Sequence, residues 1–223
     1  MNDITIIMLT PNLVPKDWAK YHKEKLLEAA DGAPIITISS KPLDWGLNLI
    51  QEAYGLTNLY KQVLRGAKTA TTELIAIADD DTLYPKDHFA FRPKEPGFYY
   101  NFNRWHLVTW GEPLYFHKPR PGGGLMIATR KLVIDAIEAR LAAYPELDDH
   151  YWDSVKELGV PIRMRKYDKH EFKPFYVPQP VVSFYHQNSI DDLVRRRKKY
   201  IWPVRAFELP LWGRAEDIRK KFK

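Results

Sequence analysis

The stretch Leu74-Ile-Ala-Ile-Ala-Asp-Asp-Asp-Thr-Leu-Tyr-Pro85 decides the fold, because a short apolar run in it ends in three consecutive carboxylates. Five apolar residues between polar neighbours are typical of a buried parallel strand, and the turn signal Tyr84-Pro85 closes the segment. Asp79, Asp80 and Asp81 are therefore predicted at the carboxyl end of a strand. Open α/β sheets bind their ligands at that edge.

Three adjacent like charges repel one another unless a cation or hydrogen-bond donors compensate them. Oxygen ligands of this kind suit Mg²⁺ or Mn²⁺, which usually take further ligands from substrate phosphates. The alternative is a solvated acidic turn in which one aspartate caps the next element, an arrangement that is common in loops. The strand context favours the metal-binding interpretation.

Length and composition bound the remaining possibilities. The chain has 223 residues, enough for one large α/β domain or a domain with an appendage, and its 45% hydrophobic content argues against a disordered protein. Cysteine is absent, which excludes disulfides and thiolate metal sites. No run approaches the roughly 18 apolar residues of a membrane span, and the amino terminus lacks a signal-peptide pattern, so we expect a cytoplasmic protein without membrane insertion. The net charge of +6 suggests an anionic partner.

The first part of the chain has the pattern of a wound sheet. Residues 4–10 and 34–39 are predicted strands, with a helix over about 17–30 between them. A second helix, over 58–73, leads into the strand that carries the aspartates. A strand–helix–strand start implies a parallel sheet with a right-handed crossover.

Beyond Pro85 the composition changes to proline, aromatic residues and short strand-like runs such as 97–102 and 114–116. This change predicts an antiparallel half that shapes the substrate site. The run 181–186 has the pattern of a further strand. Helices are predicted over 130–143, 147–158 and 215–223, and from 189 into the basic run 195–199.

Four groups of residues follow one another in a distinctive order. Thr10-Pro-Asn12 ends the first predicted strand, and the aspartate triplet follows. Next come Arg120-Pro-Gly-Gly-Gly124, then Glu146-Leu-Asp-Asp-His-Tyr-Trp152, and finally Ser183-Phe-Tyr-His-Gln-Asn-Ser189. This order resembles the inverting, metal-dependent glycosyltransferases with the GT-A fold, particularly the large family two. Each motif is weak alone, and the joint order over nearly the whole chain carries the resemblance.

The resemblance implies a fold and an activity. The fold would be a single GT-A (Rossmann-like) α/β domain over residues 1–223, with a mixed, mainly parallel sheet flanked by helices. Residues of about 1–85 would form the nucleotide-sugar-binding half, and about 86–223 the acceptor-binding half. The activity would be transfer of a hexose or pentose from a nucleotide sugar, a UDP-sugar being favoured, to a hydroxyl acceptor with inversion.

The resemblance also implies a metal and donor site. Asp79 and Asp81 match the Asp-X-Asp motif that binds Mn²⁺ or Mg²⁺, and His186 matches a late histidine that completes the metal shell. A histidine in an aromatic strand is explained equally well as a hydrogen-bonded core residue. Donor contacts are expected from Thr10, Asn12, Ser39, Asp79, Asp80, Gly123 and Gly124. Many relatives carry an aspartate where this chain has Ser39, so the nucleotide base stays open.

Asp149, with Asp148 as its rival, matches the general base of the family. An aspartate at a helix start also caps free N–H groups, and both roles can hold at once. The three glycines have a second interpretation as a flexible turn before the helix. Acceptor contacts are expected from Trp105, Trp110, Arg120, Arg195 and Arg196. Aromatic residues usually belong to the core, however, and a run of basic residues usually forms a solvated helix face.

The acceptor stays open, and a polyanion such as hydroxymethylated DNA or an anionic glycan suits the basic chain. Three other functions compete with glycosyl transfer. Nucleotidyl transfer also uses strand-end carboxylates, but the segment 10–15 lacks the glycine of a phosphate loop. A two-metal nuclease would use the same aspartates. A nucleic-acid-binding module would use the basic run at 195–199, and it would tolerate the loss of Asp81.

Overall fold

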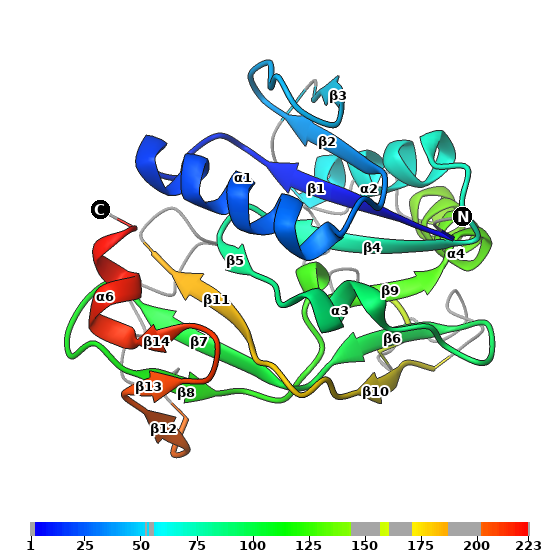
Figure 1. Cartoon of the computed structure of the whole chain (residues 1–223). Coiled ribbons are helices and arrows are strands. Elements are labelled where there is room, and N and C mark those ends of the chain that lie inside the picture. The colour runs from blue at the N-terminus through cyan, green and yellow to red at the C-terminus, as the bar shows by residue number, and fades with distance from the viewer. Residues whose placement is uncertain are drawn as a thin grey trace.

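The computed structural model describes residues 3–51, 53, 56–143, 157–160, 171–186 and 202–222, which form two principal sheets with flanking helices (Figure 1). The larger sheet has seven strands. In order across the sheet they are β10 (Lys173–Phe175), β6 (Phe98–Asn101), β9 (Met126–Thr129), β4 (Leu74–Asp79), β1 (Ile4–Thr10), β2 (Ile35–Ser39) and β3 (Leu47–Ile50).

The centre of this sheet is parallel, as the sequence predicts. β1 pairs in parallel with β2 on one side and β4 on the other, and β2 pairs in parallel with β3. Only β9 runs antiparallel to its neighbours, β4 and β6. Every residue of β1 and β2 is buried, which explains why their sequences are nearly continuous apolar runs. The predicted α/β class with a mixed, mainly parallel sheet is confirmed.

Helices cover both faces of the large sheet. α1 (Lys16–Ala30) and α3 (Lys86–Ala90) lie on one face, whereas α2 (Leu56–Thr69) and α4 (Arg130–Ala143) lie on the other (Figure 1). A β-carbon at Gly66 would overlap with the side chain of Ile7, so this glycine lets α2 approach β1 closely. The helices predicted over 17–30 and 130–143 are thus present, and α2 ends four residues earlier than predicted.

The second sheet has five strands: β12 (Arg205–Ala206), β8 (Tyr115–His117), β7 (Arg104–Val108), β11 (Val181–Tyr185) and β5 (Thr82–Leu83). β11 runs parallel to β7, and the other pairs are antiparallel, so the predicted antiparallel half is mixed. The two halves interleave, because β5 from the first half joins this sheet while β6, β9 and β10 from the second half complete the larger one.

The remaining described elements are short. They are η1 (Gly123–Leu125), a hairpin of β13 (Glu208–Leu209) and β14 (Gly213–Arg214), and α6 (Ala215–Lys220). The helix predicted from 189 lies outside the described residues, and so does nearly all of the helix predicted over 147–158. No helix of the described chain is both long enough and apolar enough to cross a membrane.

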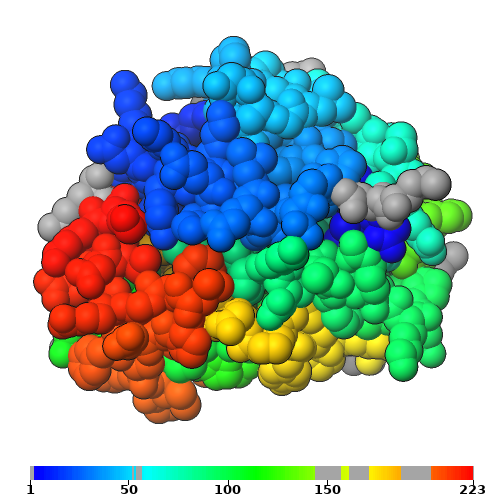
Figure 2. All heavy atoms as spheres, in the orientation of Figure 1, coloured from blue at the N-terminus to red at the C-terminus, as the bar shows by residue number. Residues whose placement is uncertain are grey.

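α1 joins the cores of the two sheets. Leu26 near its end packs in the core of the large sheet, whereas Trp18 near its start packs in the core of the small one. The Trp18 ring lies 4.4 Å from the ring of Phe184 and 4.8 Å from that of Phe222, centroid to centroid. The carboxyl-terminal segment therefore lies directly beside α1, as the space-filling view shows in red and blue (Figure 2). This packing fixes the two sheets relative to each other.

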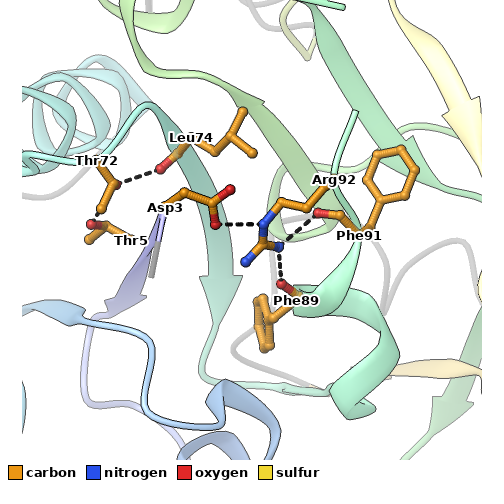
Figure 3. Close-up of polar contacts among 7 residues, drawn as sticks. All are labelled: Asp3, Thr5, Thr72, Leu74, Phe89, Phe91 and Arg92. Carbon is orange, nitrogen blue, oxygen red and sulfur yellow. Dashed lines mark hydrogen bonds and ion pairs between the residues drawn. The ribbon is translucent and has the colours of Figure 1, made fainter. Parts of the chain in front are cut away.

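The amino-terminal edge of the large sheet is closed by structural contacts. Arg92 donates to the Asp3 carboxylate at 2.6 Å and to the carbonyls of Phe89 and Phe91 at 2.6 and 2.9 Å (Figure 3). A pocket of about 300 Å³ also lies at this edge, with a mostly apolar lining. Lys86 and Asp31 in its wall pair with each other at 2.7 Å. The charged side chains that line it, Asp31, Lys86 and Arg92, are thus all engaged in ion pairs. The aspartate triplet lies at the opposite edge of the sheet.

Candidate functional site

The candidate site lies where β1 and β4 end side by side. From β1 the chain passes through α1 to β2 on one side, while β4 lies on the other side, so the connections diverge at this point. Such a divergence opens a crevice at the carboxyl edge of a parallel sheet. Thr10 ends β1 and Asp79 ends β4, and the register places Leu9 opposite Asp79. The aspartate triplet therefore occupies the position that the sequence predicts.

The three carboxylates of the triplet point toward three different parts of the fold. Asp80 faces β1, because its Oδ2 accepts a hydrogen bond of 2.5 Å from the Thr10 hydroxyl. Asp81 faces β11, where its Oδ2 lies 3.4 Å from Nε2 of His186. Asp79 faces the glycine segment, where its carboxylate accepts from the backbone N–H of Gly124. One short turn thus connects the large sheet, the small sheet and the glycines between them.

Two of the three glycines allow the protein's own side chains to approach the backbone closely. A β-carbon at Gly124 would overlap with the Asp79 carboxylate and the Tyr84 hydroxyl, and one at Gly122 would overlap with the Arg104 guanidinium. Gly123 is different, because it is exposed and a β-carbon there would meet nothing within 4 Å. Of the three, Gly123 alone has open space before it for a ligand. The spacing of the motif does not reveal this division.

Tyr84 ties the aspartate turn to the glycine segment. Its buried hydroxyl accepts from the backbone N–H of Asp79 at 2.9 Å and donates to the carbonyl of Gly124 at 2.7 Å. In the sequence this tyrosine is only part of a turn signal before proline. Its role in the site depends on a contact across 40 positions of sequence, which no local pattern shows.

Burial together with the charge of Asp81 raises the pKa of Asp79 to about 7 and that of Asp80 to about 8. The nearby Arg104 guanidinium and the Gly124 N–H act in the opposite direction on Asp79. Asp79 and Asp80 therefore bind protons more readily near neutral pH than ordinary aspartates do. A bound divalent cation would favour the ionised carboxylates.

Strand pairing brings His186 to Asp81. β11 lies antiparallel to β5 with Ser183 opposite Thr82, and the Phe184 N–H donates to the Asp81 carbonyl at 2.8 Å. His186 follows directly after β11, so its ring reaches the carboxylate of Asp81. The side chains of His186 and Asp81 are 8% and 20% exposed. They form a nearly enclosed pair of which the Asp81 carboxylate is the more exposed member.

Two donors of this kind fit a cation that arrives with a substrate. Among the described residues, no group of three or more His, Cys, Asp or Glu side chains is arranged to hold a metal ion. Mg²⁺ is usually bound by one or two carboxylates together with substrate phosphates and water, and an imidazole is an ordinary ligand for Mn²⁺. Asp81 and His186 could therefore hold such a cation once a phosphate completes its coordination.

Residues of α1 pack against the aspartate triplet, a role that the sequence does not indicate. Trp18, which is fully buried, donates from Nε1 to the Asp80 carbonyl at 2.7 Å. His22 is buried one turn later, and burial lowers its pKa to about 4. Both residues have the spacing of ordinary core positions in an amphipathic helix. Trp18 and His22 lie beside the aspartate turn because α1 packs against the cores of both sheets.

The remaining predicted donor residues line the ends of β1 and β2. Asn12 has a positive φ of 56°; its N–H donates to the Thr10 hydroxyl at 2.9 Å, and its Oδ1 accepts from the Lys41 N–H at 2.8 Å. The Ser39 hydroxyl is fully buried, donating to the Lys41 carbonyl at 2.7 Å and accepting from Asn48 at 2.9 Å. These contacts hold the two loops together beside the triplet.

Of the predicted acceptor residues, Trp105, Trp110 and Arg120 lie in the described part of the chain. Trp105 packs partly buried against the core of the small sheet and donates to Asn103 at 3.1 Å, while Trp110 packs beside Val108. Arg120 is exposed just before the glycines. The other predicted residues, Asp148, Asp149, Arg195 and Arg196, lie outside the described residues.

Comparisons with known proteins identify solved structures with a similar fold but no matching family. No family model matches the chain, and the search of curated proteins finds no match. One similar solved structure is a mannosyltransferase from Pyrobaculum calidifontis in complex with GDP-Man and Mn²⁺, which is 14% identical, with a TM-score of 0.47 and coverage of 84% of this chain and 58% of that one. Another is a putative nucleotide-diphospho-sugar transferase from Desulfovibrio desulfuricans, 10% identical, with a TM-score of 0.46 and coverage of 90% and 89%.

A third similar structure is a 2-C-methyl-D-erythritol 4-phosphate cytidylyltransferase from Thermus thermophilus, 12% identical, with a TM-score of 0.45 and coverage of 81% and 92%. Sugar transferases and a nucleotidyltransferase thus occur together among the similar structures. At these identities and TM-scores the similarities do not choose between the two activities. That choice depends on the residues of the site.

Proposed function

We propose that the protein is a metal-dependent glycosyltransferase that moves a sugar from a nucleotide-sugar donor to a hydroxyl acceptor. The observation that supports this best is the pair of Asp81 and His186, which distant segments bring to 3.4 Å at the carboxyl edge of the large sheet. The neighbouring Asp80 accepts a hydrogen bond from the Thr10 hydroxyl, on the side where a nucleotide binds in sheets of this kind. The donor base and sugar are open, a UDP-sugar being favoured by the resemblance.

A divalent cation, Mn²⁺ or Mg²⁺, would stabilise the negative charge that develops on the departing diphosphate. In this proposal Asp81 and His186 hold the cation, with Asp79 as a third candidate ligand. Asp79 lies close to Arg104 and accepts from the Gly124 N–H, so we assign it the additional task of fixing the glycine segment. Asp80, held by Thr10, faces the ribose.

The acceptor hydroxyl must lose a proton as it attacks the anomeric carbon. We propose that Asp149 accepts this proton, with Asp148 as the alternative. The glycosyltransferases that this chain resembles carry their general base at this point in the motif order. Gly123, exposed between two sterically required glycines, would leave room for the transferred sugar. Arg195 and Arg196 remain candidate contacts for an anionic acceptor such as hydroxymethylated DNA or an anionic glycan.

A panel of nucleotide sugars, each incubated with the protein and Mn²⁺, tests the proposal. We expect release of a nucleoside diphosphate from one of them, and we expect excess chelator to abolish the release. Asp81→Asn should abolish it as well, while Lys131→Ala, past the far end of β9, should leave it unchanged. Release of pyrophosphate from a nucleoside triphosphate instead would identify a nucleotidyltransferase and contradict the proposal.

A further inference from the structure

Three aromatic rings from distant parts of the chain pack together beside the aspartate turn. They belong to Trp18 in the first turn of α1, Phe184 in β11 and Phe222, which follows α6. The ring centroid of Phe222 lies 4.8 Å from that of Trp18 and 4.8 Å from that of Phe184, and the centroids of Trp18 and Phe184 lie 4.4 Å apart. All three side chains are buried. We call these three residues the aromatic cluster.

The aromatic cluster fixes both peptide groups that flank Asp81. The carbonyl of Asp80 belongs to the peptide group before Asp81, and it accepts a hydrogen bond from Nε1 of Trp18 at 2.7 Å. The carbonyl of Asp81 belongs to the peptide group after it, and it accepts from the Phe184 N–H at 2.8 Å. Because a peptide group is planar, a hydrogen bond to its carbonyl orients the whole group. The two bonds therefore restrain φ and ψ of Asp81, and with them the direction of its side chain.

The same cluster contacts the second proposed cation ligand. The ring centroid of Phe222 lies 4.9 Å from that of His186, at an interplanar angle of 47°. His186 is also only two residues beyond Phe184, whose ring stacks on that of Phe222 at 12°. The distance of 3.4 Å between Nε2 of His186 and Oδ2 of Asp81 thus depends on two residues that the aromatic cluster holds from both sides of the site.

A cation site that has few protein ligands depends on how well these ligands are oriented. In known metal sites, loss of a group that orients a ligand typically lowers the metal affinity about 10–100-fold. The three rings belong to the packed core of the small sheet, so they cannot move without opening that core. They are therefore suited to hold Asp81 and His186 in place before a cation and a diphosphate arrive.

An ordinary role in the core would explain the burial of these rings but not the polar contact of Trp18. A phenylalanine at this position would fill much of the same space, yet it could not donate to the Asp80 carbonyl. The indole N–H joins α1 to the one turn of the chain that carries the three carboxylates. This contact distinguishes a positioning role from packing alone.

We propose that Trp18, Phe184 and Phe222 are positioning residues that hold Asp81 and His186 in the geometry in which they bind the divalent cation. This inference rests on the proposed function, because that function supplies the cation. It adds that the affinity for the cation is set partly by α1 and by the segment after α6, which contain none of the sequence motifs.

Electron paramagnetic resonance tests the proposal, because the signal of free Mn²⁺ decreases when the protein binds the ion. The protein is titrated with Mn²⁺ in the presence of UDP and, in parallel, of GDP. Trp18→Phe keeps an aromatic ring but removes the N–H donor, and it should weaken Mn²⁺ binding about tenfold or more. Phe222→Leu removes the ring beside His186 and should weaken binding less, by about two- to tenfold.

Leu209→Ala is the matched control, because it removes a side chain from the same core at β13. It should lower the melting temperature at least as much as Trp18→Phe does, but it should leave Mn²⁺ binding unchanged. Equal binding by Trp18→Phe and the wild type, or an equal loss in Leu209→Ala, would overturn the positioning role. If Trp18→Phe does not fold, Phe222→Leu is compared with the same control and decides the question by the same criteria.

Turnover of the nucleotide-sugar panel, measured in parallel, separates this inference from the proposed function. Weaker Mn²⁺ binding by Trp18→Phe, in a protein that turns over no donor, would support the positioning role and contradict glycosyl transfer. Donor turnover with unchanged Mn²⁺ binding by Trp18→Phe and Phe222→Leu would overturn the positioning role alone. Absence of Mn²⁺ binding by the wild type with either nucleotide would overturn the cation site and the positioning role together.

Discussion

The two sheets place their polar side chains in different ways. In the large sheet the central strands β1 and β4 are almost wholly apolar, and the reactive groups collect where these strands end, at Thr10 and at the aspartates. In the small sheet polar and basic groups lie within the packed structure itself. His106 and Lys118 are 0% and 1% exposed, and Arg104 packs its guanidinium over Gly122.

This difference indicates a division of labour. The apolar central strands make the large sheet a rigid platform that presents an acidic edge. The small sheet carries buried charges at a cost in stability, which is typical of a surface that recognises a ligand. Two of the contacts between the sheets lie at this edge: Asp81 with His186, and Arg104 over Gly122 beside Asp79. Substitutions at and away from these contacts test the comparison.

The largest effect is expected from Asp81→Asn. The amide keeps the shape of the side chain but removes the charged ligand, so metal-dependent donor turnover should fall roughly 10²-fold or more. His186→Gln should cost less, because it removes a neutral ligand. Calorimetry with Mn²⁺ and a nucleoside diphosphate measures the binding, and diphosphate release measures the turnover. An Asp81→Asn enzyme that binds and turns over the donor normally would show that the acidic edge is only structural.

Gly124→Ala should destabilise the fold by about 1–3 kcal/mol, because the new β-carbon overlaps with the Asp79 carboxylate and the Tyr84 hydroxyl. Gly123→Ala is the matched control, with nothing within 4 Å, and its stability should stay within about 0.5 kcal/mol of the wild type. Urea denaturation measures both variants. If Gly123→Ala nevertheless weakens donor turnover, the open space before it is occupied by substrate; equal stability of the two variants would contradict the steric role of Gly124.

His88 tests the pH dependence of the large sheet. Its ring is buried against Tyr84, Phe89 and Phe175, and burial lowers its pKa to about 3. The unfolded chain takes up the proton below the ordinary pKa of 6.5, whereas the native state does so only near 3, so this histidine's contribution to stability is lost as the pH falls through that range.

His88→Gln keeps a polar partner for Asn101 but does not titrate. Between about pH 6 and 4 the decline of its unfolding free energy should be shallower than that of the wild type by up to about 1.4 kcal/mol per pH unit. The comparison of the two proteins cancels the opposite contribution of Asp79 and Asp80, whose raised pKa values favour the native state at acid pH. Equal slopes for the two proteins would show that the ring becomes protonated without unfolding.

The smallest effect is expected at the amino-terminal edge. Arg92→Ala removes the bonds to Asp3 and to the carbonyls of Phe89 and Phe91, yet the ion pair is largely exposed, so the loss should be about 1 kcal/mol or less. Donor turnover should not change. A loss of turnover comparable to that of Asp81→Asn would place functional groups at both ends of the sheet and remove the contrast between its edges. Thermal unfolding and diphosphate release provide the two measurements.

The sequence by itself determined the parallel centre of the large sheet and the position of the aspartates at its edge. The strands β1 and β4 follow from their continuous apolar runs, and the helices α1 and α4 from the spacing of their apolar residues; both are local properties of the sequence. β3, β9 and β10 were not predicted, because three or four residues carry few positions for a pattern; β6 and β8, which are equally short, were predicted from their aromatic runs.

Tertiary structure alone decided how the site is assembled. The pairing of β5 with β11 carries His186 to Asp81, and the family resemblance, rather than any pattern around His186, suggested that residue. The sequence shows three equal glycines, whereas the fold presses Gly122 against Arg104, presses Gly124 against Asp79, and leaves Gly123 open. Strand register and the approach of distant side chains depend on which segments pair across the whole chain, and a local pattern of residues contains no information about that pairing.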